Sequence, residues 1–252
     1  MGRAVIAVVS AVTDAYAAAT RPDPRRPLDV ARARDQHAAY LDAMQWLGHE
    51  VVALTPDPAH PDAVFVEDQA VVVGRRALIC RSGHPGRRAE APRVAEALAG
   101  LGLALTWTPD PATLDGGDVL RLGDTLLVGR SARSDDGGLA ALAAAFPALE
   151  VVPVALPTGV LHLKCVCSSP APGWALAAPG VALDRWAQVI PVHPDDAWAA
   201  NVVGAEGKVV VGAGFPRVSA ALRGAGFAVR EVELGELRAG DGSLTCLSIL
   251  VG

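Results

Sequence analysis

The sequence contains almost no lysine and has no excess of positive charge. Lys164 and Lys208 are its only lysines, and the formal net charge of the 252 residues is −5. Proteins that bind nucleic acid or anionic membrane surfaces usually do so through positively charged patches. We therefore expect neither a nucleic-acid partner nor a membrane partner.

The sequence also lacks a disulfide pattern, a signal peptide and a membrane span. Its four cysteines show neither the spacing of a disulfide scaffold nor a C-x-x-C motif. The N-terminal stretch MGRAVIAVVSAVTDAY is too short and too interrupted for a signal peptide or a transmembrane helix. These absences predict a cytoplasmic protein.

One pattern recurs along the chain. Two aliphatic runs separated by a short glycine-containing turn, which is typical of a β-hairpin, begin near residues 67, 116, 162 and 200. Most of these units continue with apolar residues at helical spacing, as in 89–102. A lone strand then follows, as in 103–109. A repeat of this length is typical of propellers and arrays.

A fifth unit is divided between the two ends of the chain. Residues 243–252 supply one strand, residues 3–10 another, residues 32–48 the helix and residues 49–56 the outer strand. We therefore expect the two ends to pair and close a ring, which removes exposed edge strands. With 51% hydrophobic residues, the sequence predicts a single α/β domain over 1–252, a five-bladed α/β propeller.

Polar side chains gather at the strand-to-loop junctions of the repeated units. They supply carboxylates, cations, an imidazole and a thiol: Glu67, Asp68, Arg81, Arg87, Arg88, Asp115, Asp118, Arg130, Arg133, His162, Lys164 and Cys246. Each alone has an ordinary structural explanation, since cysteines are often buried in cores and acidic residues often occupy turns. Their recurrence at equivalent places indicates that they meet in one central pocket, with Cys246 on the strand nearest the axis.

Metal binding is a competing interpretation of the same residues. His162, Cys165, Cys167 and Cys246 offer zinc-ligand atoms. The C-x-C spacing of Cys165 and Cys167 is shorter than the C-x2–4-C spacing of structural zinc sites. We therefore expect no required metal and no cofactor, and incidental zinc on Cys246 and His162 remains open.

Six motifs spread over nearly the whole chain identify a family resemblance. FVEDQAVV, RSGHPGRR, LDGGDVL, LHLKC, DVARARDQHAAY and DGSLTCLSILV resemble motifs of the dimethylarginine dimethylaminohydrolases, in the guanidino-group-modifying (pentein) superfamily. The resemblance implies the same five-bladed propeller. It also implies a hydrolase that converts asymmetric dimethylarginine and monomethylarginine to citrulline and a methylated amine, through a covalent cysteine thiouronium and without a cofactor.

The resemblance assigns catalytic roles motif by motif. It implies that Cys246 is the nucleophile and His162 the general acid and base, with Asp115 orienting His162. Asp68, with Glu67 beside it, would hold the guanidinium of a small-molecule substrate.

Further residues are implied for the amino-acid end of that substrate. Asp62 would bind the α-ammonium group, and Arg87 and Arg133 the α-carboxylate. Residues 13–28 match the family's mobile lid in position, with a contact expected near Thr20, and the backbone of Gly240 is expected to touch substrate.

The sequence leaves two alternatives open. One is another guanidine-modifying enzyme, such as an arginine deiminase or a hydrolase of a different N-substituted arginine. Free-arginine deiminases of the superfamily carry H-x-D, whereas the third position here is Lys164. The other is a non-catalytic binder, as in a ribosome anti-association factor with this propeller, but a binder is expected to lack the pair Cys246 and His162. The oligomeric state, a homodimer included, stays open.

Overall fold

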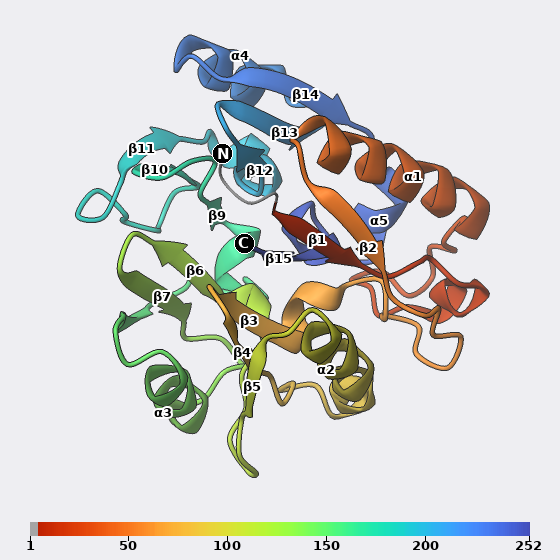
Figure 1. The fold of residues 1–252 in the computed structure, drawn as a ribbon. Coiled ribbons are helices and arrows are strands. Elements are labelled where there is room, and N and C mark those ends of the chain that lie inside the picture. Colours follow the sequence, from red (N-terminus) through yellow and green to blue (C-terminus); the bar gives the residue numbers. More distant parts are fainter. Residues whose placement is uncertain (1–4) are drawn as a thin grey trace.

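Five small sheets surround a common centre in the computed structural model of the protein, which describes residues 5–252. Each sheet has three strands, and the C-terminal strand lies close to the centre (Figure 1). The fold is therefore the five-bladed α/β propeller that the repeat predicts.

Every sheet follows one plan. Its inner and middle strands pair antiparallel, as a hairpin in four of the five sheets, and its outer strand runs parallel to the middle one. From the innermost to the outermost strand the sheets are β3 (Ala70–Val73), β4 (Arg76–Ile79) and β5 (Ala104–Trp107); β6 (Val119–Leu122), β7 (Thr125–Gly129) and β8 (Glu150–Val154); β9 (Cys167–Ser168), β10 (Trp174–Ala177) and β11 (Gln188–Pro191); β12 (Val203–Ala205), β13 (Lys208–Gly212) and β14 (Ala228–Val232); and β15 (Ser248–Val251), β1 (Ile6–Val9) and β2 (Glu50–Ala53).

The two ends of the chain close the ring, as predicted. Strand β1 pairs antiparallel with β15, with Ile6 opposite Val251, and parallel with β2. The predicted strand 3–10 appears at Ile6–Val9, and its first two positions lie outside the described residues. The fifth sheet thus pairs strands from the two ends of the chain, with Val9 opposite Ser248.

Helices connect the middle strand of a sheet to its outer strand. They are α1 (Val30–Trp46), α2 (Ala91–Gly100), α3 (Asp136–Ala145) and α4 (Pro216–Gly224), and a short helix, α5 (Gly235–Ala239), follows β14. Asp29 caps α1 by accepting the Arg32 backbone N–H at 3.0 Å. The third sheet differs from the others, because residues 178–187 make the same connection without a helix.

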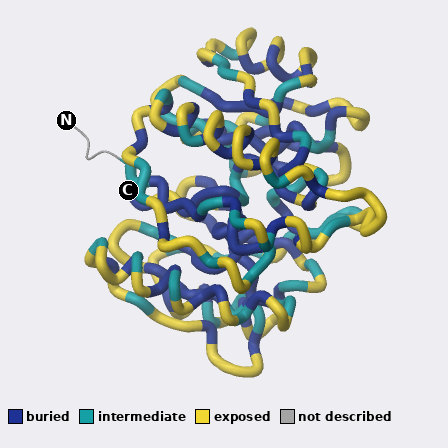
Figure 2. Tube along the Cα trace, turned by 90° about the vertical axis from the view of Figure 1, so that its right-hand side faces the viewer, coloured by how far each residue is buried: buried dark blue, intermediate teal, exposed yellow. Residues whose placement is uncertain are grey.

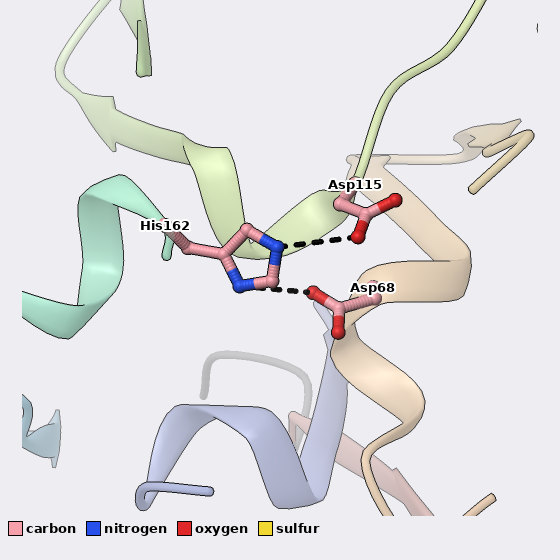
Figure 3. A group of neighbouring side chains, drawn as sticks. All are labelled: Asp68, Asp115 and His162. Atoms are coloured by element: carbon pink, nitrogen blue, oxygen red, sulfur yellow. Dashed lines mark hydrogen bonds and ion pairs between the residues drawn. The ribbon is translucent and has the colours of Figure 1, made fainter. Parts of the chain in front are cut away.

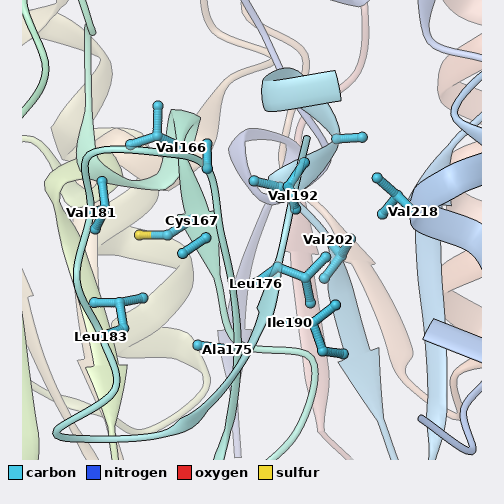
Figure 4. Close-up of a cluster of buried hydrophobic side chains, with 14 of the residues drawn as sticks. Val166, Cys167, Ala175, Leu176, Val181, Leu183, Ile190, Val192, Val202 and Val218 are labelled. Atoms are coloured by element: carbon cyan, nitrogen blue, oxygen red, sulfur yellow. The ribbon is translucent and has the colours of Figure 1, made fainter. Parts of the chain in front are cut away.

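Hydrophobic clusters fill the spaces between neighbouring sheets and beneath the helices. Figure 4 shows part of one cluster, in which Leu176 and Ile190 of the third sheet lie near Val202 and Val218 of the fourth unit. The buried residues lie in the interior, and the exposed ones follow the loops and the outer turns of the helices (Figure 2). Packing between blades therefore fixes the junctions that face the axis.

The helices of this fold pack on the sheets. Among residues 5–252, none is both long enough and apolar enough to cross a bilayer.

Candidate active site

A short 3₁₀ turn precedes each inner strand, and these turns converge near the axis. They are η2 (Val66–Gln69), η4 (Gly116–Asp118), η5 (Leu163–Cys165), η6 (Pro194–Ala200) and η7 (Thr245–Leu247). Asp68 belongs to η2, Asp115 and His162 directly precede η4 and η5, and Cys246 belongs to η7. The placement of Cys246 on a strand was wrong: β15 begins only at Ser248, and the turn before it carries the thiol.

One cavity brings most of the predicted residues together. Its lining comprises Thr20, Asp62, Phe65, Asp68, Arg87, Arg133, Leu161, His162, Gly240, Asp241 and Cys246. Eight of the ten predicted site residues are in this lining, whereas Asp115 and Glu67 are not.

His162 is held between two carboxylates. Its Nε2 lies 3.2 Å from Asp115 Oδ2, and its Nδ1 lies 3.8 Å from Asp68 Oδ1 (Figure 3). Although burial opposes protonation, the carboxylates of Asp68 and Asp115 hold the pKa of His162 well above its usual value. These carboxylates therefore favour the imidazolium, the form that can donate a proton.

Asp115 is completely buried behind His162. Its carboxylate also accepts hydrogen bonds from the Gly83 backbone N–H at 2.9 Å and from Arg133 Nη1 at 3.3 Å. These donors fix the carboxylate, so Asp115 in turn fixes the plane of the imidazole. The geometry agrees with the orienting role that the resemblance implies for Asp115.

The paired glycines of LDGGD allow this close approach. A Cβ atom on Gly117 would lie 2.7 Å from Asp68 Oδ1 and 2.8 Å from His162 Nδ1, and one on Gly116 would lie 2.0 Å from the Glu67 carbonyl oxygen. The Gly117 backbone N–H instead donates to Asp68 at 3.0 Å. Glycine is required at both positions because any side chain would push the site residues apart.

Asp68 forms a buried ion pair with Arg87. The rest of the Arg87 guanidinium donates to Glu90, through Nε at 3.0 Å and Nη2 at 2.8 Å, and to the Phe65 carbonyl oxygen at 2.7 Å. Burial would raise the pKa of Asp68, but His162 and Arg87 lower it to about 2. Asp68 is therefore ionised and ready to accept from a cation. Binding of an α-carboxylate by Arg87 stays a prediction, since most of its N–H groups already have acceptors here.

The segment 13–28 reaches the cavity through Thr20. Its backbone N–H and its hydroxyl each donate to the Asp62 carboxylate at 3.0 Å. Gly240 lies where a Cβ atom would come within 2.3 Å of Tyr16 Oη, so a glycine there lets the segment 13–28 pack on α5. The structure thus gathers Thr20, Asp62 and Gly240 at one side of the cavity, and their contacts with substrate stay predictions.

Glu67 points away from this cavity. Its carboxylate accepts from Lys164 Nζ at 2.5 Å and from Thr245 Oγ1 at 2.7 Å. All three residues line a second cavity of about 250 Å³, which runs between the inner strands of the sheets. Glu67 and Asp68 therefore serve different sides of the turn η2, and Lys164 does not reach the cavity that holds Cys246.

Cys246 is half-buried, and its Sγ lies 3.3 Å from Ser243 Oγ. Burial, together with the carboxylates of Glu67 and Asp68, raises the pKa of the Cys246 thiol well above its usual value. The resting side chain is therefore a thiol. A bound cation beside Asp68 would favour the thiolate, because it would offset the charge of these carboxylates.

The same residues offer potential metal ligands. Ligand atoms of Asp68, Asp115 and His162 lie within 4.8 Å of one another. However, both imidazole nitrogens face carboxylates in Figure 3, which suits a charged imidazolium better than a metal-binding imidazole. The arrangement is explained by ion pairing alone.

Three residues that line the cavity were not predicted from the sequence. Phe65 and Leu161 are apolar and have no feature that marks a site, whereas Asp241 has a feature that could have been recognised. Asp241 has a positive φ of 64° and stands between two glycines, a setting that often marks a functional turn. Glu90 was also missed, although it lies three residues after Arg87 in the 3₁₀ turn η3 (Pro85–Glu90).

Comparison with known proteins places this geometry in a family. No protein-family model matches the chain. A dimethylarginine dimethylaminohydrolase of Streptomyces coelicolor is 36% identical over 232 residues, covering 89% of this chain and 88% of the relative. The enzyme of that name from Pseudomonas aeruginosa is 31% identical over 227 residues, covering 88% and 89%.

Solved structures agree with these relatives. The Pseudomonas aeruginosa enzyme, as a cysteine-to-serine variant in complex with citrulline, has a TM-score of 0.92 and 28% identity over 99% of both chains. A cyanobacterial arginine dihydrolase domain has a TM-score of 0.90 but only 22% identity, which shows a shared fold. With the relatives matched over most of their length, the chain belongs to the dimethylarginine dimethylaminohydrolase family.

Proposed function

We propose that this protein hydrolyses arginine bearing methyl groups on one guanidine nitrogen, giving citrulline and the methylated amine. The observation that carries the proposal is the shared cavity of Cys246, His162 and Asp68, in which neighbouring charges favour the imidazolium of His162 and the carboxylate of Asp68. Two solved structures of dimethylarginine dimethylaminohydrolases support the same chemistry: one holds citrulline, and one is a histidine-to-glycine variant with an S-methyl-L-thiocitrulline adduct.

The reaction begins with the substrate guanidinium on Asp68. A guanidinium is a poor electrophile because its charge is spread over three nitrogens, so its carbon must be held against the nucleophile. The Cys246 thiol loses its proton to solvent, since His162 already carries one, and the thiolate adds to this carbon to form a tetrahedral adduct. His162 then gives its proton to the departing nitrogen, and the methylated amine leaves. The remaining product is a thiouronium on Cys246.

Water completes the cycle. Neutral His162 takes a proton from a water molecule, which adds to the thiouronium carbon. The C–S bond breaks, the departing sulfur takes the remaining hydroxyl proton, and the ureido group of citrulline and the Cys246 thiol are released. Two steps with lower barriers replace one difficult hydrolysis, as in other covalent catalysis.

The position of Lys164 supports a preference for alkylated substrates. Unsubstituted arginine has two terminal NH₂ groups, and a site that binds both with carboxylates rejects analogues that leave one carboxylate unpaired. Here the position that would supply the second carboxylate is Lys164, which is bound to Glu67 on the other side of the turn. Methyl groups on the unpaired side bury apolar area, with a gain of about 0.8 kcal/mol each.

The four cysteines support a cytoplasmic setting for this activity. All four thiols are free in the structure. Proteins of oxidising compartments usually carry disulfides, so free thiols suit a reducing environment.

The test is kcat/KM measured for asymmetric dimethylarginine, monomethylarginine, symmetric dimethylarginine, arginine and agmatine, with citrulline and amine both quantified. We expect the first two to be the best substrates, and symmetric dimethylarginine to be poor because it places a methyl group on the Asp68 side. A higher kcat/KM for arginine or agmatine than for asymmetric dimethylarginine and monomethylarginine would contradict this proposal and indicate a deiminase.

A further inference from the structure

We propose that Asn201 is a positioning residue for the nucleophile: it fixes the turn that carries Cys246. The proposal rests on the proposed function, in which Cys246 attacks the substrate. Asn201 directly follows η6 and is 1% exposed. It belongs to the fourth unit of the propeller, between the units that carry His162 and Cys246, and it does not line the substrate cavity.

The Asn201 amide uses all of its hydrogens in contacts with the neighbouring units. Its Nδ2 donates to the Lys164 carbonyl oxygen at 2.8 Å and to Thr245 Oγ1 at 2.9 Å, and its Oδ1 accepts from the Thr245 backbone N–H at 3.0 Å. The orientation of the amide is determined, because a carbonyl oxygen can only accept and a backbone N–H can only donate.

Two of these bonds hold the residue next to the nucleophile. Thr245 directly precedes Cys246, and Asn201 forms hydrogen bonds with both the backbone N–H and the hydroxyl of Thr245. Within residues 5–252, the Cys246 thiol has one hydrogen-bond partner, the Ser243 hydroxyl. The position of the thiol therefore depends on how its turn is held as well as on this contact with Ser243.

The bonds close a ring of four residues behind the nucleophile. The Thr245 hydroxyl accepts from Asn201, so its own proton is directed at Glu67, at 2.7 Å. The other oxygen of Glu67 accepts from the Lys164 ammonium group. The Lys164 carbonyl oxygen accepts from Asn201 and so completes the ring. The ring links the turns η2, η5 and η7, and loss of Asn201 would loosen all three.

Loss of the ring would also change the charge near the thiol. Glu67 is one of the carboxylates that raise the pKa of the Cys246 thiol, and the Thr245 hydroxyl and the Lys164 ammonium offset part of its charge. Without Asn201 to direct it, the Thr245 hydroxyl is free to turn away from Glu67. The thiolate would then form less readily.

The test compares Asn201→Leu and Thr245→Val with the wild type. Leucine has a similar size but no polar atoms, and valine replaces only the threonine hydroxyl. We expect kcat for asymmetric dimethylarginine to fall about 10- to 100-fold in both, with KM within about twofold, because misplacing a reacting group by about 1 Å costs on that order. The rate constant for alkylation of Cys246 by iodoacetamide at pH 8 should fall as well, and its pH profile should move to higher pH.

Two further variants separate positioning from general stability. Thr245→Ser keeps the hydroxyl and should keep near wild-type kcat. Ser168→Ala is the matched control, since Ser168 Oγ donates to the Ala200 carbonyl oxygen and accepts from the Val202 N–H at 2.9 Å. It holds the same segment without touching Thr245, so its loss should lower Tm while kcat and alkylation stay near wild-type values.

Folded Asn201→Leu with wild-type kcat and alkylation would overturn the proposal. Ser168→Ala losing as much kcat as Asn201→Leu would do the same, because stability alone would then explain the loss. If Asn201→Leu fails to fold, the pair Thr245→Val and Thr245→Ser decides, and equal activity in both rejects the role. Alkylation needs no substrate, so it tests Asn201 even if methylated arginines are not hydrolysed.

Discussion

Asp115 and His162 form a buried pair, with 3.2 Å between Asp115 Oδ2 and His162 Nε2. Asp115→Asn should keep the shape but remove the charge, so the pKa of His162 should fall. Since His162 acts as an acid, the fraction of protonated enzyme at neutral pH falls with it, and we expect about 10²-fold lower kcat. The check is the pH dependence of kcat: its alkaline limb should move to lower pH. An unchanged limb would mean that Asp115 does not tune His162.

The charge on His162 also predicts how stability varies with pH. Its pKa is raised in the folded protein, so its stabilising contribution is complete below the ordinary value of 6.5 and is lost as pH rises through the raised value. The difference in Tm between wild type and His162→Gln should therefore be largest near pH 6 and smaller in alkaline buffer. Thermal unfolding at several pH values measures this, and a difference that grows with pH would contradict it.

His162 as proton donor predicts a dependence on the leaving group. Removing a general acid costs about 10²–10⁴-fold, so His162→Gly should turn over methylated arginine very poorly. A thiol leaving group needs no proton, so the variant should still react with a thiocitrulline-type substrate at Cys246. Single-turnover rates for both substrates are the measurement. Normal turnover of methylarginine by the variant would exclude this role.

Gly117 is predicted to tolerate no side chain. In Gly117→Ala the new Cβ would lie 2.7 Å from Asp68 Oδ1 and 2.8 Å from His162 Nδ1. We expect about 1–3 kcal/mol of destabilisation and a large loss of kcat, because both groups must move. Gly100→Ala is the control, since nothing lies within 4 Å of its Cβ position at the end of α2. Urea unfolding and kcat of both variants test this, and equal behaviour would refute the steric argument.

The repeat allowed the ring to be predicted from sequence. Each hairpin carries its own alternating aliphatic pattern, and the unmatched strands at the two ends could pair only with each other. Equivalent positions in the repeat also predicted that Asp68, Asp115, His162 and Cys246 surround one axis. The helix missing from the third unit was less predictable, because the turn-forming residues 178–187 replace it.

The partners of single side chains could not be predicted in the same way. Glu67 and Asp68 are adjacent in sequence, but a 3₁₀ turn has about three residues per turn, so neighbours point about 120° apart. Glu67 therefore meets Lys164 on the far side of η2. Arg87 can be buried because Glu90, one turn later in η3, pairs with it, and that i, i+3 spacing was visible in RSGHPGRRAE.

The most direct test is to trap the covalent intermediate during turnover of asymmetric dimethylarginine. The reaction is quenched with acid, the protein is digested, and the modified peptide is mapped by mass spectrometry. We predict a thiouronium adduct on Cys246, and Cys246→Ser should fold normally but show neither adduct nor turnover. An adduct on Cys80, Cys165 or Cys167, or full activity in Cys246→Ser, would contradict nucleophilic attack by Cys246.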